Sequence, residues 1–149
     1  MLPSCHLDPT TVNDATPKAT PGHLYEWQGG IYRYVQLKDS VTYVKGHTLL
    51  AAATDLTAAT NDTSGGSALG LKCIGIAQAV YTTDYYGYIM VSGVCDVIGD
   101  GSVAAGEFVI QGTDGVADTM ADGEEEQVFG MALEDDDSNV IFACAVSCL

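Results

Sequence analysis

The sequence predicts a small antiparallel all-β domain, a barrel or sandwich with Greek-key or barrel connections, that carries an extended N-terminal arm. Three observations support this fold class. Short apolar segments of strand length recur from residue 24 onward, turn-forming residues separate them at regular intervals, and no long helical period interrupts them. With 149 residues, the chain is long enough to bury a core of its own without metal or disulfides.

The N-terminal 22 residues differ in composition from the rest of the chain. They are rich in Pro, Thr, Asp and Asn, and they show no hydrophobic periodicity. We therefore expect residues 1–22 to form an extended arm and residues 23–149 to form the β-rich domain. Such an arm is either disordered or docked on a neighbouring subunit or larger surface, and both readings stay open. It contains no apolar stretch like that of a secretory signal, so export is not indicated.

The first strands are predicted as a hairpin. Residues 24–28 and 31–37 flank Gly29 and Gly30, which can adopt the positive φ angles of a tight turn. Alternation puts one set of side chains on one face of the second strand and the tyrosines on the other. The first set is Ile31, Arg33, Val35 and Leu37, and the second includes Tyr32, Tyr34 and Gln36.

Further strands are expected along the whole chain. Alanines favour a helix over residues 49–60, but the threonines and the missing 3.6-residue stripe oppose it. Residues 61–67 read as a loop. The expected strands are 41–44, 48–50, 73–80, 85–91, 94–98, 108–111, 128–133 and 140–146.

Two glycine-centred patterns occur once in each half of the chain. A strand-glycine-strand unit surrounds Gly46 and again Gly106, and an apolar-Gly-apolar-Ala strand surrounds Gly75 and again Gly130. Glycine inside a strand often marks a bend or a close approach of backbones. The sequence therefore suggests a weak internal repeat with two equivalent bends.

Charge is unevenly distributed. The net charge is −15, yet residues 1–72 carry five basic and six acidic residues, whereas residues 73–149 carry fourteen acidic residues and no Lys or Arg. Nucleic acid and anionic lipid surfaces require clustered cations, so both are excluded as partners. No apolar run approaches the roughly 20 residues that span a bilayer.

No residue pattern indicates an active site, a metal or a cofactor. His6, His23 and His47 lack metal-ligand spacing, and the five cysteines form neither a disulfide framework nor a zinc motif. We interpret the cysteines as small buried apolar residues of a chain that is synthesised in a reducing compartment. Formation of a disulfide after release into an oxidising medium is the alternative that stays open. The acidic clusters at 114–126 and 134–137 lack the alternation of a calcium loop and read as solvated hairpin tips.

Aromatic residues gather near two predicted hairpins. Their apolar rings and polar tips suit an edge shared with a partner, while ordinary cross-strand packing is the alternative. The groups are Tyr25, Trp27, Tyr32 and Tyr34, and Tyr81, Tyr85, Tyr86 and Tyr88.

An ordered set of motifs in the second half resembles a known family. It comprises Ile-Gly-Ile-Ala at 74–77, a Gly-to-Val stretch at 87–94, an Ala-Ala-Gly turn within 103–109, Phe-Gly-Met-Ala-Leu-Glu at 129–134 and a closing strand at 140–142. This order is similar to that of the capsid decoration, or cement, proteins of tailed bacteriophages. The departures are the cysteine-rich last strand and the Pro-rich arm.

The resemblance implies a non-enzymatic structural protein of the virion. Such a protein is synthesised in the host cytoplasm, binds the outer surface of the head as a homotrimer or dimer, and clamps subunits of the major capsid protein against internal DNA pressure. We expect the nearly neutral first half to contact the capsid and the acidic second half to face solvent. The hypothetical contact residues are Pro9, Pro17, Pro21, Tyr25, Trp27, Tyr32 and Tyr34.

Two other function classes stay in view. One is a receptor- or glycan-binding β domain of a phage fibre, with a site among the tyrosines. The other is a small hydrolase that acts through loop carboxylates. No acid, base and nucleophile converge in the sequence, which argues against the hydrolase.

Overall fold

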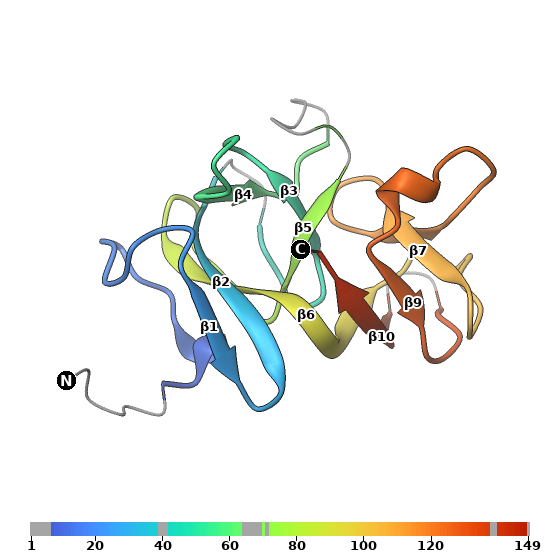
Figure 1. Ribbon diagram of the computed structural model, residues 1–149, viewed down its shortest axis with the longest axis horizontal. Coiled ribbons are helices and arrows are strands. Elements are labelled where there is room, and N and C mark those ends of the chain that lie inside the picture. The colour runs from blue at the N-terminus through green and yellow to red at the C-terminus, as the bar shows by residue number, and fades with distance from the viewer. Residues whose placement is uncertain (1–6, 39–41, 64–69, 71, 138–139, 149) are drawn as a thin grey trace.

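The computed structural model describes residues 7–38, 42–63, 70, 72–137 and 140–148. These residues form ten strands and two short 3-10 helices, so the all-β prediction is confirmed (Figure 1). The helices are η1 (Pro9–Thr11) and η2 (Glu125–Gln127). The strands are β1 (Leu24–Trp27), β2 (Gly30–Leu37), β3 (Thr48–Ala51), β4 (Ala58–Thr60), β5 (Cys73–Ala77), β6 (Tyr86–Ile98), β7 (Phe108–Gln111), β8 (Ala117–Thr119), β9 (Gly130–Ala132) and β10 (Ile141–Ser147).

The five strands β2 to β6 close a first barrel. Their order is β2-β4-β3-β5-β6, and β6 pairs back to β2. All neighbours are antiparallel except β2 and β4, which run parallel. β1 adds to the outer side of β2 through the predicted hairpin, whose turn places Gln28 and Gly29 at φ of 46° and 79°. Closure removes the free edges that an open sheet would expose.

The long strand β6 belongs to a second set of five strands as well. Beyond Ser92 it pairs with β10, which is followed by β9, β7 and β8. β8 returns to the end of β6, because Gly99 and Ala117 form a parallel bridge and the Asp100 N–H donates to the Ala117 carbonyl at 3.1 Å. Followed from β6 in the opposite direction, the second set has the order β6-β8-β7-β9-β10, which matches β2-β4-β3-β5-β6 of the first barrel. The parallel contact of β8 with the end of β6 then corresponds to the parallel pair of β2 and β4.

Backbone hydrogen bonds match between the two halves. The Gly46 N–H donates to the carbonyl of Ala77 (2.7 Å), as the Gly106 N–H does to the carbonyl of Ala132 (2.8 Å). The N–H groups of Ala77 and Ala132 donate in turn to the carbonyls of His47 and Glu107, which directly follow the two glycines, at 2.9 Å each. The glycines at 75 and 130 also occupy matching places, opposite Leu49 and Val109. The paired glycines noted in the sequence therefore stand at equivalent points of the two strand sets.

Two cores follow from the alternation of the strands. One core fills the first barrel with residues from β2 to β6, including Val35, Leu49 and Ile89. The other fills the second strand set and continues over the outer face of β2, where it takes in Tyr32 and Tyr34. The predicted division of the β2 side chains between two faces is confirmed.

Several predicted elements differ from the structure. The expected break between strands 85–91 and 94–98 is absent, because β6 runs through Ser92 and Gly93 without a turn. No helix forms over 49–60, where β3 and β4 are joined by a loop. β8 was not predicted, and only residues 130–132 of the expected strand 128–133 are extended. Residues 42–44 of the expected strand 41–44 form no strand, and Tyr43 forms an isolated bridge to Tyr81. Residue 41 and part of the predicted loop 61–67 lie outside the described residues.

We expect Gly46→Ala to lower the free energy of unfolding more than Gly106→Ala. Both glycines have positive φ, 96° and 86°, which costs a residue with a Cβ about 1 kcal/mol. At Gly46 the new Cβ would also lie 2.8 Å from Cγ1 of Ile98, whereas nothing lies within 4 Å of it at Gly106. Urea unfolding should therefore give losses of about 1 kcal/mol for Gly106→Ala and about 2 kcal/mol or more for Gly46→Ala. Equal losses would contradict the close packing of Gly46 against β6.

Candidate binding surface

The side chains of the described residues give little support for a catalytic or metal centre. Within the described ranges, no group of three or more His, Cys, Asp and Glu side chains is placed to hold a metal ion. The same part of the chain contains no helix with the length and apolar character that a bilayer crossing requires. The remaining candidates are surfaces that could contact another protein.

The N-terminal segment, residues 7–22, lies along the first barrel of its own chain. Asp8 caps η1, since its carboxylate accepts the Thr10 N–H at 2.9 Å. Val12 is buried against the aromatic face of the barrel. Asp14 then forms a two-way backbone pair with Tyr86, at 2.8 Å in each direction. These residues thus pack on the barrel of their own chain, which differs from both disorder and docking on a neighbouring subunit.

Tyr34 holds this segment in place. Its hydroxyl donates to Oδ2 of Asp14 and accepts the N–H of Lys18, both at 3.1 Å. The Nζ of Lys18 is also 2.7 Å from Oδ1 of Asp14, although this exposed ion pair adds little stability. Burial raises the pKa of Tyr34, so the hydroxyl stays protonated and able to donate at neutral pH. The segment therefore covers one end of the aromatic cluster.

The seven contact residues suggested by the sequence differ widely in exposure. The aromatic rings pack on one another, with centroids 5.6 Å apart for Tyr25 and Tyr88 and 6.4 Å apart for Trp27 and Tyr32. The surface they offer to a partner is consequently limited. Pro9, Tyr32 and Tyr34 are buried, Pro21, Tyr25 and Trp27 are half-buried, and Pro17 is exposed.

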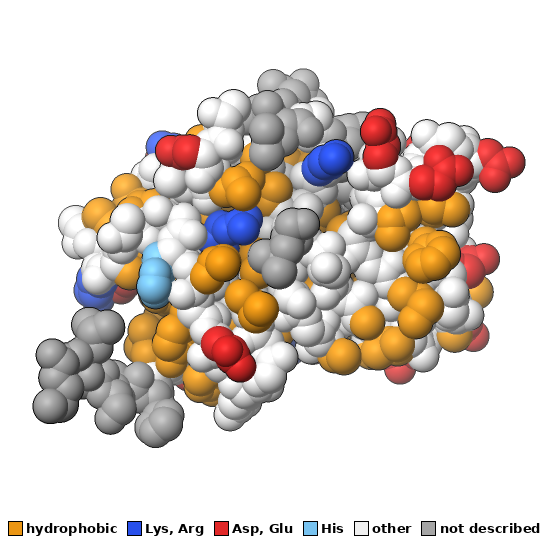
Figure 2. All heavy atoms as spheres, viewed as in Figure 1, with side chains coloured by type: hydrophobic (Ala, Val, Ile, Leu, Met, Phe, Trp, Pro, Cys, Tyr) orange, Lys and Arg blue, Asp and Glu red, His pale blue; other side chains and the backbone are white. Residues whose placement is uncertain are grey.

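A row of exposed apolar side chains crosses the outer face of the second strand set. Strand register aligns Val94, Ala145, Met131 and Phe108 across β6, β10, β9 and β7. Directly opposite residues share a face, so these four side chains form one continuous row, which we call the apolar row. Val94 is 62% exposed and Phe108 is 53% exposed. Figure 2 shows the apolar side chains gathered over β7, β9 and β10.

The apolar row was not predicted from the sequence. In β10, Ile141, Ala143 and Ala145 alternate with buried Phe142 and Cys144, so apolar residues occupy both faces of the strand. Apolar residues on both faces of one strand were the sequence signal from which an exposed apolar surface could have been predicted. From the charge distribution, residues 73–149 were expected to face solvent. Most of the exposed large apolar side chains of the described residues nevertheless lie in this half of the chain.

Acidic residues lie near the apolar row in the sequence, and several of them bond backbone groups. Glu134 accepts the Ala143 N–H at 2.7 Å, and Glu107 accepts the Ala104 N–H at 2.9 Å. Asp136 is buried and accepts the N–H groups of Gly101 and Val103 at 3.1 and 3.2 Å. The expectation that 134–137 is only a solvated tip is therefore wrong for Asp136, which fixes the loop after β6.

Comparison with known proteins gives a likeness at the level of the fold. No family model matches the chain, and no curated protein matches its sequence. Among solved structures, the chain is similar to the N base of the head fiber gp8.5 of bacteriophage phi29. The TM-score is 0.56, the identity is 15%, and the match covers 78% of this chain and 93% of that chain. The two proteins therefore share an all-β fold, and this fold occurs in a phage head fiber.

We expect Tyr34→Phe to loosen the N-terminal segment without unfolding the barrel. Losing the hydroxyl removes two hydrogen bonds, each worth about 1 kcal/mol, that hold Asp14 and the exposed Lys18. Trypsin should then cut after Lys18 at least about fivefold faster, because local opening is more frequent. Tyr86→Phe is the matched control, since that ring stacks on Tyr34 but its hydroxyl has no hydrogen bond described here. Equal cleavage rates in both variants would contradict the role of Tyr34.

Proposed function

We propose that the chain is a non-enzymatic structural protein of a phage virion. It binds the outer surface of the head and stabilises the shell by bridging neighbouring subunits of the major capsid protein. The observation that carries the proposal is the apolar row within the acidic half of the chain. The similarity in fold to a head fiber base and the order of the second-half motifs both support it.

The apolar row has the composition of a contact surface. Fully burying a Met or Phe side chain contributes about 1.5–3 kcal/mol. Contiguous exposed apolar patches with a polar rim commonly mark protein interfaces. Residues 73–149 contain no Lys or Arg, so a second copy would set carboxylates against carboxylates except where Lys45 pairs with Asp96 at 2.6 Å. The surface therefore favours a capsid protein that presents apolar residues with a basic border.

Bridging requires two contact surfaces, and the chain offers a second one at its other end. Figure 1 shows β1 and the N-terminal segment at one end of the long axis and β7 and β9 at the other. Exposed Pro17 and the half-buried rings of Tyr25 and Trp27 belong to the first end. A protein with contacts at both ends can touch two capsid subunits at once, which raises its effective affinity for the shell.

Self-association is part of the same proposal. β1 stands at the end of the strand order, so one of its edges has no neighbour among the described strands. An edge of this kind can pair with another copy to form a trimer or a dimer. Light scattering of the purified protein tests this part, and a monomer at micromolar concentration would exclude it.

We expect Met131→Glu to weaken binding to empty, expanded heads by at least tenfold. The substitution removes apolar contact from the middle of the apolar row and adds a buried charge at the interface. Phe108→Glu should act in the same direction. Cosedimentation of the variants with heads over a range of protein concentrations measures the effect.

Val80→Glu is the matched control for these variants. Val80 is 66% exposed in the loop between β5 and β6 and does not belong to the apolar row, so its substitution should leave head binding unchanged. Equal loss in all three variants would overturn the assignment of the surface. Deleting residues 1–22 would remove the buried Val12 and uncover Tyr34, so Pro17→Asp is the better test of the N-terminal end.

The receptor-binding alternative predicts a different pattern. Saturable binding of the chain to host cells or glycans, lost in Trp27→Ala and retained in Met131→Glu, would favour a fibre domain. Head binding that is lost in Met131→Glu, with no binding to cells, supports the proposal.

A further inference from the structure

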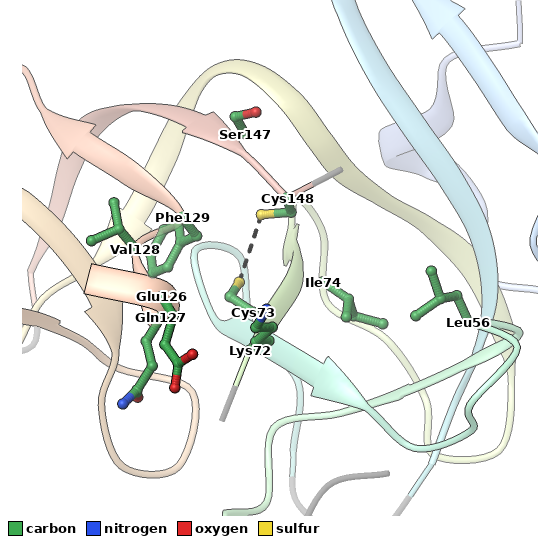
Figure 3. A pocket seen from close by; sticks show the side chains of 10 residues that line it. All are labelled: Leu56, Lys72, Cys73, Ile74, Glu126, Gln127, Val128, Phe129, Ser147 and Cys148. Carbon is green, nitrogen blue, oxygen red and sulfur yellow. Dashed lines mark hydrogen bonds between the residues drawn. The ribbon is translucent and has the colours of Figure 1, made fainter. Parts of the chain in front are cut away.

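Two cysteines from distant parts of the chain meet between the barrels. Cys73 begins β5, and Cys148 directly follows β10. Their Sγ atoms are 3.8 Å apart, and the Cys148 thiol donates to Sγ of Cys73 (Figure 3). The Cys148 backbone is fixed by its N–H, which donates to the carbonyl of Val91 in β6 at 2.7 Å. A disulfide requires about 2.05 Å between sulfurs, so the two side chains must move closer for a bridge to form.

The pair lies at a pocket that reaches solvent. The pocket has a volume of about 250 Å³ and lies between the first barrel and the segment from η2 to β9. Its lining includes both cysteines, the apolar Leu56 and Phe129, and the exposed Lys72 and Glu126 (Figure 3). One water occupies about 30 Å³, so the space admits several waters or one end of a small reagent.

Electrostatics make the two thiols unequal. Burial opposes ionisation of Cys73, but hydrogen bonds, chiefly the one that Cys148 donates, outweigh it and lower the pKa of Cys73. The hydrogen bond to Cys73 and burial raise the pKa of Cys148. Arg33 is buried near Cys148, and its Nη1 atom has no hydrogen-bond partner among the described residues. Cys73 is thus the thiol that ionises first and acts as a nucleophile.

The other two described cysteines have a different environment. Cys95 and Cys144 face each other across β6 and β10, inside the second core. Burial raises the pKa of both thiols, to about 12 for Cys144. Neither residue lines the pocket. We therefore expect these thiols to stay reduced where Cys73 and Cys148 react.

We propose that Cys73 and Cys148 form a site of reversible thiol oxidation by small disulfides of the glutathione class. The Cys73 thiolate attacks one sulfur of the oxidised reagent, forms a mixed disulfide and releases one reagent thiolate, which takes up the proton that Cys73 lost. Cys148 then loses its proton and attacks the Cys73 sulfur, which forms the intramolecular bridge and releases the second reagent thiol. The two cysteines are oxidised by two electrons, and the reagent is reduced to two thiols.

The bridge would act as a covalent latch between the two barrels. It closes a loop that contains every strand from β5 to β10, and it fixes the segment after β10 to the first barrel. Closing a loop of this size restricts the unfolded chain and should raise the melting temperature by about 10 °C. The reaction fits a protein made in a reducing cytoplasm and later released into an oxidising medium. It does not depend on the proposed function.

The test uses the full-length reduced protein and oxidised glutathione. Incubation should give a product that has lost two hydrogen atoms, and peptide mapping without reductant should identify a Cys73–Cys148 cross-link. The melting temperature should rise by about 10 °C and return on addition of a dithiol reductant. A bridge through Cys5, Cys95 or Cys144, or a product without a bridge, would overturn the proposal.

Single substitutions separate the two steps. Cys148→Ser should stop at a glutathione adduct on Cys73, with no rise in melting temperature. Cys73→Ser should react at Cys148 at least tenfold more slowly, because the better nucleophile is gone. If Cys148→Ser fails to fold, Cys148→Ala replaces it, since this side chain is only half-buried. An adduct on Cys148 alone in the wild type would reverse the assigned order and contradict the proposal.

Discussion

The structure depends on one strand, β6, which takes part in both strand sets. Its first half closes the first barrel against β2, and its second half pairs with β10. The change of partner occurs at Gly93, where φ is 130° and an added Cβ would lie 3.2 Å from Cα of Gly30. A side chain there would force β2 and β6 apart. Because the two strand sets share this backbone, the position of the second set follows from the first without a linker.

The hairpin of β1 and β2 could be predicted, because its alternation and its Gly-Gly turn are local signals. The continuity of β6 could not: Ser92 and Gly93 have the composition of a turn, and only pairing with Ile31 and Val146, distant in sequence, keeps the backbone extended. β8 was missed for a related reason. Two of its three residues, Ala117 and Asp118, are uncommon in strands, and it is extended because β7 pairs with it.

The candidate surfaces could be predicted only in part. Aromatic clustering near β1 and β2 was visible in the sequence, but the rings of Tyr32 and Tyr34 lie inward because a second core covers that face of β2. A sequence pattern cannot tell an apolar face that packs on a neighbouring element from one that meets solvent. The apolar row illustrates the converse, since β10 is apolar on both faces and only the assembled sheet reveals which one stays open.

The acidic charge of the second half acts at two levels. Asp136 and Glu134 satisfy backbone N–H groups that would otherwise lack partners, so part of the charge serves the turns of the fold. Of the remaining carboxylates, Asp84 and Asp96 form ion pairs with Lys38 and Lys45, and the excess, which includes Glu107 next to Phe108, gives this half of the chain a negative field. Such a field opposes pairing of two identical rows and speeds encounter with a basic partner, and salt weakens both effects. Net charge alone therefore does not identify a solvent face, because the same carboxylates can select what binds between them.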